Sequence, residues 1–292
     1  MPLPEFEFHE PATVDEACRM IGELGQKTKL LAGGTDLLVN MKKKLLAPDH
    51  LVSLDRIQSL AQLDSSNGSL RIGPCVKAAE MAESDAVISD FPALYEGASK
   101  LGSPLIRNLA TVGGNLVTAR PAADFPPSLI AYGATLVLKS IQEERTVPLM
   151  EFFQAPGQTV LSPDEMLEAI VVEKPSPLSG SAYIKLGVRE ALEISLVNVA
   201  ALLTLDESDG SITAARVVMG SVAPTPLLSP SAEKVLLGEK PSDVLFLHAG
   251  EAAASDSKPI DDFRASAEYK RAMVRELTRR ALTLALSRVQ KQ

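Results

Sequence analysis

The sequence contains few residues that can hold a metal or form a disulfide. Its 292 residues include two cysteines and three histidines. Cys18 and Cys75 belong to no Cys-x-x-Cys cluster, which argues against a disulfide framework, a zinc site or an iron–sulfur cluster held by this chain alone. The histidines are scattered, at positions 9, 50 and 248, and predict neither a metal constellation nor a nucleophile–base pair. We therefore expect no metal site and no catalytic residue on this chain.

Signals for secretion, membrane insertion and nucleic-acid binding are also absent. No uncharged apolar run reaches the roughly 18 residues that a membrane span needs. The start, MPLPEFEFHEPA, has neither the basic stretch nor the apolar core of a signal peptide. A net charge of −8 argues against binding to nucleic acid. These absences predict a cytoplasmic chain, and a hydrophobic content of 46% is enough for a core spread over two or three subdomains.

Two segments share an unusual build. The first glycine loop (residues 30–38, LLAGGTDLL) places Gly33-Gly34 between an apolar run and a threonine, and the second (residues 106–115, IRNLATVGGN) places Gly113-Gly114 between a threonine and an asparagine. Glycine adopts positive φ at little cost, so each segment predicts a loop that can turn several backbone N–H groups toward one anion. Two such loops facing each other would bind a diphosphate.

The residues alone leave a plainer interpretation open. A chain with 18 glycines in 292 residues is expected to contain about one adjacent pair by chance. An apolar segment ended by Gly-Gly is also typical of an ordinary strand-to-turn corner. The sequence has no G-x-G-x-x-G and no G-K-[ST], so neither a dinucleotide-binding fingerprint nor a P-loop is present.

Periodicity predicts a chain of mixed helix and strand. Thr13 and Glu16 form a capping box that opens an amphipathic helix up to Gly25, between strands at 6–8 and 29–32, and a further helix is expected over 35–41. We next expect strands at 49–54, 70–72, 145–149 and 166–172, a helix at 91–101 and an apolar, then strand-like segment at 129–138. Residues 174–181 are typical of a linker, and beyond it we expect an antiparallel sheet at 183–186, 197–205 and 212–222 and helices at 231–237, 242–254 and 266–289.

The sequence resembles the FAD-binding subunit of the molybdenum hydroxylases, the family of xanthine dehydrogenase and the medium subunit of aerobic carbon monoxide dehydrogenase. The matching segments, in the family's order, are LAGGTDLL at 31–38, IRNLATVGGN at 106–115, ARPAADFPP at 119–127, LSPDEML at 161–167, YIKLGVR at 183–189 and RASAEYKR at 264–271. The resemblance implies an α+β fold. A two-subdomain FAD-binding domain of the vanillyl-alcohol-oxidase/PCMH type would span 1–175, with a βαβ subdomain at 1–55 and a second subdomain at 56–175. A C-terminal domain of an antiparallel sheet plus helices, of the molybdenum hydroxylase flavoprotein type, would span 176–292.

The resemblance also implies a site for noncovalent FAD. One side would be formed by Leu30, Leu31, Ala32, Gly33, Gly34, Thr35, Asp36 and Leu37, with the N–H groups of Gly33, Gly34 and Thr35 directed at the diphosphate. The other would be formed by Thr111, Gly114 and Asn115, while Leu101 and Leu167 would touch the ligand. Asp124 would accept hydrogen bonds from hydroxyl groups of the ligand, whereas the residues alone favour a helix N-cap ahead of Pro126. Lys185 would lie near the flavin ring, its alternative being an exposed strand lysine, and Ile194 would pack on the ring face.

The same family implies partners. A molybdenum-cofactor subunit would hydroxylate the substrate, a 2Fe-2S subunit would carry the electrons out, and FAD on this chain would deliver them to the final acceptor. We expect a dimer of such heterotrimers. Two alternatives come from other functional classes: a stand-alone flavin oxidase or dehydrogenase of related fold, and a non-enzymatic module that has lost its flavin.

Overall fold

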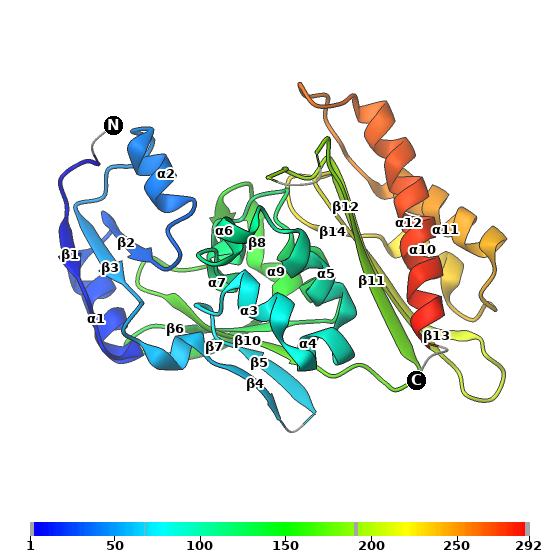
Figure 1. Cartoon of the computed structure of the whole chain (residues 1–292), viewed down its shortest axis with the longest axis horizontal. Coiled ribbons are helices and arrows are strands. Elements are labelled where there is room, and N and C mark those ends of the chain that lie inside the picture. Colours follow the sequence, from blue (N-terminus) through cyan, green and yellow to red (C-terminus); the bar gives the residue numbers. More distant parts are fainter. Residues whose placement is uncertain (1–2, 67, 190–191, 290–292) are drawn as a thin grey trace.

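The computed structural model describes residues 3–66, 68–189 and 192–289, which form three units in chain order (Figure 1). The N-terminal unit is a parallel three-stranded sheet with the order β1-β3-β2. Its elements are β1 (Glu7–His9), α1 (Val14–Leu24), β2 (Thr28–Leu31), α2 (Leu37–Lys42) and β3 (His50–Ser53). Helices α1 and α2 connect its parallel strands, and the first glycine loop connects β2 to α2.

The start of α1 follows directly from its sequence. Thr13 Oγ1 accepts the N–H of Glu16 at 3.1 Å, and Glu16 Oε2 accepts the N–H of Ala12 at 2.7 Å. The first bond satisfies an N–H group that the first turn of a helix leaves without a partner, and the second holds the residue that precedes the N-cap. The apolar face of α1, which includes Cys18, packs in one core with Val52. Burial raises the pKa of the Cys18 thiol to about 11, which fits a core residue without redox chemistry.

The middle unit is built on a five-stranded antiparallel sheet with the order β4-β5-β10-β6-β7. The strands are β4 (Leu63–Ser66), β5 (Ser69–Ile72), β6 (Thr135–Lys139), β7 (Glu144–Pro148) and β10 (Met166–Glu173). A 3-10 helix η1 (Gln58–Ala61), a hairpin of β8 (Phe153–Ala155) and β9 (Gln158–Thr159), and short helices complete it. These helices are α3 (Ala78–Glu83), α4 (Asp85–Asp90), α5 (Pro92–Lys100), α6 (Pro104–Arg107), α7 (Val112–Val117), α8 (Phe125–Ala131) and α9 (Leu149–Phe152).

The C-terminal unit is a four-stranded antiparallel sheet covered by helices on both faces (Figure 1). It contains β11 (Ser179–Leu186), β12 (Val197–Leu205), β13 (Ile212–Gly220), β14 (Leu227–Leu228), α10 (Pro230–Leu236), α11 (Asp243–Asp256) and α12 (Ala267–Val289). Ala200 and its neighbours on one face join the core of the middle unit, whereas Val199 and Ala201 on the other face pack under the C-terminal helices. Because both faces are buried, β12 is an almost continuous apolar run.

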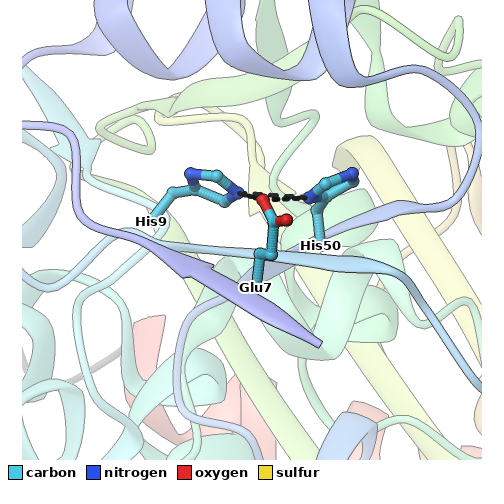
Figure 2. Close-up of side chains that lie close together, drawn as sticks. All are labelled: Glu7, His9 and His50. Atoms are coloured by element: carbon cyan, nitrogen blue, oxygen red, sulfur yellow. Dashed lines mark hydrogen bonds and ion pairs between the residues drawn. The ribbon is translucent and has the colours of Figure 1, made fainter. Parts of the chain in front are cut away.

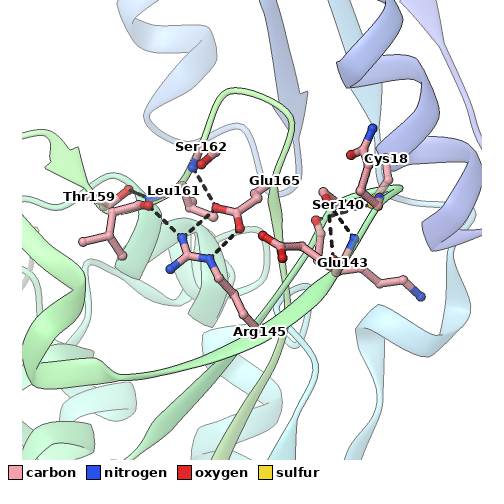
Figure 3. Close-up of polar contacts among 11 residues, drawn as sticks. Cys18, Ser140, Glu143, Arg145, Thr159, Leu161, Ser162 and Glu165 are labelled. Atoms are coloured by element: carbon pink, nitrogen blue, oxygen red, sulfur yellow. Dashed lines mark hydrogen bonds and ion pairs between the residues drawn. The ribbon is translucent and has the colours of Figure 1, made fainter.

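Polar contacts of β6 connect the middle unit to the N-terminal unit, and contacts of the adjacent β7 order the segment before β10 (Figure 3). The Cys18 thiol donates to the carbonyl oxygen of Lys139 at 3.5 Å, and Lys139 Nζ lies 3.0 Å from Asp15 Oδ1. On the adjacent strand, Arg145 donates to both carboxylate oxygens of Glu165 at 2.6 and 2.8 Å. This ion pair of Arg145 and Glu165 holds the LSPDEML segment (residues 161–167) beside β7.

The predicted elements are found within a few residues of their expected bounds, with three differences. The stretch 106–115, predicted as a loop, contains the end of α6 and the start of α7. Residues up to Ala131, predicted as the beginning of an apolar strand-like segment, belong to α8. The predicted linker at 174–181 ends early, because β11 begins at Ser179. Among the described helices, none is both long enough and apolar enough to cross a membrane.

Candidate functional site

The two glycine loops, which are far apart in the sequence, touch through their backbones. A Cβ atom on Gly33 would lie 1.9 Å from the carbonyl oxygen of Leu109, so only glycine allows this approach. A cavity of about 290 Å³ opens between the loops. The predicted residues that line it are Leu30, Ala32, Gly33, Gly34, Thr35, Asp36, Leu37, Leu101, Thr111, Gly114 and Asn115.

The first glycine loop presents unpaired donors to this cavity. In the part of the chain that the structure describes, no acceptor receives the N–H of Gly33, Gly34 or Thr35. Gly34 has a φ of 69°, the left-handed conformation that favours glycine. Successive N–H groups left free in this way form a concavity that binds anions. These are the N–H groups that the sequence analysis directs at a diphosphate, and that assignment stays a prediction.

The second glycine loop is built differently from the prediction. Thr111 is the N-cap of α7 and its Oγ1 accepts the N–H of Gly114 at 3.1 Å, while the N–H of Asn115 donates to the carbonyl oxygen of Thr111 at 3.0 Å. Neither Gly113 nor Gly114 has a positive φ, so the expected left-handed turn is wrong here. Because these N–H groups are already used, the loop can meet a ligand only through the side chains of Thr111 and Asn115.

The glycines of α7 are required for space. A Cβ on Gly113 would lie 2.4 Å from Cβ of Pro74, which shows that the helix packs tightly against the segment after β5. A Cβ on Gly114 would meet only Thr111 Oγ1, at 2.8 Å, and would otherwise project into open space. Gly114 lines the cavity, so its missing side chain leaves room for a bound group beside the first loop.

A second cavity, of about 720 Å³, continues from the first toward the C-terminal unit. The two share Asp36, Asn115 and Thr118, so they form one groove. Ser221 lies in the wall of the second cavity with a φ of 66°, and its buried hydroxyl has no partner in the described residues. A strained residue with an unpaired polar group is typical of a ligand site. The charged side chains of this lining are Lys43, Arg120, Lys258, Arg264 and Lys270 against Asp36, Asp124 and Asp262, an excess of positive charge that favours an anionic ligand.

Asp124 lies at the floor of the second cavity in a buried ion pair. Lys185 Nζ lies 2.9 Å from Asp124 Oδ1 and 3.0 Å from Oδ2, and Tyr183 Oη donates to Oδ1 at 2.8 Å. Burial raises the pKa of Asp124, and the charge and hydrogen bond of Lys185 oppose that shift. The Asp124 side chain makes no helix-capping hydrogen bond, and only 8% of the Lys185 side chain is exposed. Asp124 therefore occupies the N-cap position of α8 without capping it through its side chain, and the interpretation of Lys185 as an exposed strand lysine is wrong.

Other predicted residues lie outside this lining. Among the residues that the structure describes, Leu31, Leu167 and Lys185 line neither cavity. Leu167 is buried in the core of the middle unit, and Lys185 lies behind the lining as the partner of Asp124. Ile194 lines the second cavity and is 52% exposed at its rim. The sequence reasoning missed Ser221 and Thr118. Thr118 lies one helical turn beyond Gly114, so recognising 112–117 as a helix would have identified it.

The groove defines a class of protein. Free backbone donors for a diphosphate, a glycine that leaves room beside them and a longer cavity leading to a second unit are the features of a dinucleotide-cofactor site. The family described as "FAD binding domain in molybdopterin dehydrogenase" matches residues 4–175, and "CO dehydrogenase flavoprotein C-terminal domain" matches residues 182–285. The chain belongs to this family of oxidoreductase flavoproteins, which confirms the resemblance, the α+β fold class and FAD as the cofactor.

Similar proteins agree with this membership. The carbon monoxide dehydrogenase medium chain of Hydrogenophaga pseudoflava is 32% identical over 98% of both chains. A xanthine dehydrogenase FAD-binding subunit of Escherichia coli O157:H7 is 31% identical over 96% of both chains. A solved structure of carbon monoxide dehydrogenase from H. pseudoflava, lacking the Mo-pyranopterin moiety of its cofactor, superposes with a TM-score of 0.94 and 33% identity over 99% of both chains.

Proposed function

We propose that this chain is the electron-transfer subunit of a multi-subunit molybdenum hydroxylase, in which FAD receives electrons from 2Fe-2S clusters on a partner subunit and passes them to an external acceptor. The observation that carries the proposal is the set of free N–H groups on Gly33, Gly34 and Thr35, facing Gly114 across the cavity. The flavin supplies the redox chemistry, and the protein supplies binding, orientation and electrostatics.

Each part of the groove has its own task in this proposal. The N–H groups of the first glycine loop bind the diphosphate, and Thr111 and Asn115 contribute side-chain donors from the opposite wall. Lys185 and Asp124 together are neutral, so they serve as a hydrogen-bonded anchor for the ligand and not as a free cation beside the ring. No histidine or cysteine lines either cavity in the described residues, in keeping with a cofactor held noncovalently.

The rim of the second cavity is where we place the partner. Ile194, Ile260 and Phe263 are 52%, 73% and 92% exposed, and Ile194 and Ile260 line the cavity mouth. Large apolar side chains exposed beside a redox cofactor favour burial against another subunit. We propose that the 2Fe-2S subunit docks here, that a molybdenum-cofactor subunit completes the complex, and that two such heterotrimers associate. Relatives named as medium chains or subunits support this assembly.

The test is affinity purification from the native cells with this chain as bait. We expect two further subunits, a visible spectrum containing flavin and iron–sulfur bands, and molybdenum by metal analysis. Phe263→Asp should release the partners while flavin stays bound, whereas Val244→Asp, on the exposed surface of α11, should release nothing. Recovery of the chain alone with flavin and substrate turnover would establish the stand-alone flavin oxidase instead, and recovery without flavin would establish the non-enzymatic module.

A further inference from the structure

Three side chains of the N-terminal unit converge on one point, although the sequence separates them widely. His9 Nε2 and His50 Nδ1 are 3.3 Å apart, and Glu7 Oε2 lies 3.5 Å from His50 Nδ1 and 3.9 Å from His9 Nε2 (Figure 2). The prediction that the scattered histidines form no constellation is therefore wrong for His9 and His50. His248, in α11, is not part of this group.

The convergence follows from strand pairing. β1 and β3 are parallel neighbours, and their register places Glu7 directly beside His50. Side chains of a strand alternate between its two faces, so Glu7 and His9 point to the same side. Paired residues of adjacent strands also share a face, which adds His50 to that side. All three residues are thus placed on one face by strand pairing and not by a loop.

The distances match those of a metal-binding site. A tetrahedral Zn²⁺ ion holds its nitrogen and oxygen ligands at about 2.0–2.2 Å, which places two ligand atoms about 3.3–3.6 Å apart. The pairs at 3.3 and 3.5 Å already meet this condition, and the third, at 3.9 Å, reaches it by a small rotation of the Glu7 side chain, which is 73% exposed. We propose that Glu7, His9 and His50 bind a divalent transition-metal ion, with Zn²⁺ as the fitting species and solvent at the fourth position.

The ligand types also favour this class of ion. Two imidazoles and one carboxylate suit Zn²⁺ and its neighbours, whereas Mg²⁺ and Ca²⁺ prefer oxygen ligands alone. The His9 and His50 side chains are 23% and 21% exposed, so an ion can reach them from solvent. Bound there, it connects β1 to β3. The three residues line neither cavity of the FAD groove, so the expected role is to hold the N-terminal strand in place.

The alternative is a simple hydrogen bond between two neutral histidines, with one ring N–H donating to the other ring. Metal titration distinguishes the two, because the ion replaces that hydrogen. The full-length, flavin-loaded chain without a polyhistidine tag is stripped with a chelator and titrated with Zn²⁺ by calorimetry. Titration with Co²⁺ reports coordination geometry through its visible absorption. We expect one equivalent per chain, a tetrahedral Co²⁺ spectrum and a higher melting temperature with Zn²⁺.

The variants make the assignment specific. His9→Ala and His50→Ala should each weaken Zn²⁺ binding by at least about tenfold and abolish the shift in melting temperature. Glu7→Gln, at an exposed position that cannot affect folding strongly, should weaken binding as well. His248→Ala removes the third histidine of the chain and should change nothing. Absence of saturable binding, unchanged binding in His9→Ala and Glu7→Gln, or equal loss in His248→Ala would each overturn the proposal. Flavin content is measured in parallel, so failure here leaves the proposed electron-transfer function untouched.

Discussion

Lys185 and Asp124 form a buried ion pair between the two domains that the family comparison identifies. Lys185 belongs to β11 of the C-terminal domain and Asp124 precedes α8 of the FAD-binding domain, and their side chains are 8% and 9% exposed. Lys185 also donates to the carbonyl oxygen of Lys100 at 3.2 Å. Asp124, which lines the candidate groove, is therefore paired with a residue that follows the FAD-binding domain in the chain.

Replacing Lys185 by methionine should destabilise the protein. The change keeps the length of the side chain but leaves the Asp124 carboxylate buried without its cation, which costs about 3–5 kcal/mol. Urea denaturation measures the loss. In the double variant Asp124→Asn/Lys185→Met no charge is left uncompensated, so its destabilisation should be smaller than the sum of the single variants by about 0.5–3 kcal/mol. Strictly additive effects would show that the two residues do not act as a pair.

Gly114→Ala should weaken FAD binding in a folded chain. The added methyl group would lie 2.8 Å from Thr111 Oγ1, so this hydroxyl must shift, but it would strike no backbone or core residue. Because Gly114 lines the cavity, the variant narrows the space for the ligand and disturbs Thr111 beside it. We expect at least tenfold weaker binding, about 1.4 kcal/mol, measured by flavin titration of the apoprotein.

The matched control for Gly114→Ala is Gly22→Ala in α1, where a Cβ meets nothing within 4 Å and flavin affinity should not change. Gly33→Ala is a different case, because its Cβ would strike the backbone of Leu109 and separate the two loops. That variant should lose stability together with flavin. Wild-type affinity in Gly114→Ala would remove α7 from the binding site.

The pair of Arg145 and Glu165 should make stability fall in acid. The hydrogen bond from Arg145 holds the pKa of Glu165 below its usual value of 4.5. A carboxyl group whose pKa is lower in the folded state stabilises the fold above its usual pKa, and this contribution is lost as the pH falls through 4.5 toward the folded pKa. Glu165→Gln should therefore cost about 1–3 kcal/mol at neutral pH and less at lower pH. Denaturation curves across this range test it, and an equal cost at every pH would contradict it.

The flavin should be released completely by acid precipitation. Covalent flavin attachment uses residues such as histidine and cysteine, and none lines the described groove. Cys75 is the nearer cysteine in sequence to α7, but burial raises the pKa of its thiol to about 12, so it is not nucleophilic at neutral pH. All yellow colour should appear in the supernatant. Flavin that sediments with the protein would show a covalent bond.

Local signals in the sequence predicted local structure well. Thr13 and Glu16 predicted the start of α1, and the Gly33-Gly34 corner was placed correctly, because both depend on neighbouring residues. The stretch 106–115 was wrongly predicted as a loop, because Gly113 and Gly114 are poor helix formers. The reason for these glycines in α7 is the close approach of Pro74 to Gly113 and the cavity beside Gly114. That reason is a tertiary contact, which one-dimensional patterns do not contain.

Contacts between residues far apart in the sequence could not be predicted either. His9 and His50 are 41 residues apart, and only the parallel pairing of β1 with β3 brings them together. The same holds for Asp124 and Lys185, 61 residues apart, which were predicted as two separate ligand contacts and proved to be partners. Register between strands depends on the whole fold, so such pairs are found only when the sheet order is known.

The ion pair across the domain boundary also sets an order of events during synthesis. The ribosome delivers the FAD-binding domain first, and at that stage both glycine loops are present while the Asp124 carboxylate has neither Lys185 nor the Tyr183 hydroxyl. The ion pair can form only after β11, which pairs with β12, has emerged from the ribosome. A nascent chain arrested before Lys185 should therefore hold flavin weakly, and stable retention of the cofactor should mark the moment when the C-terminal domain has folded.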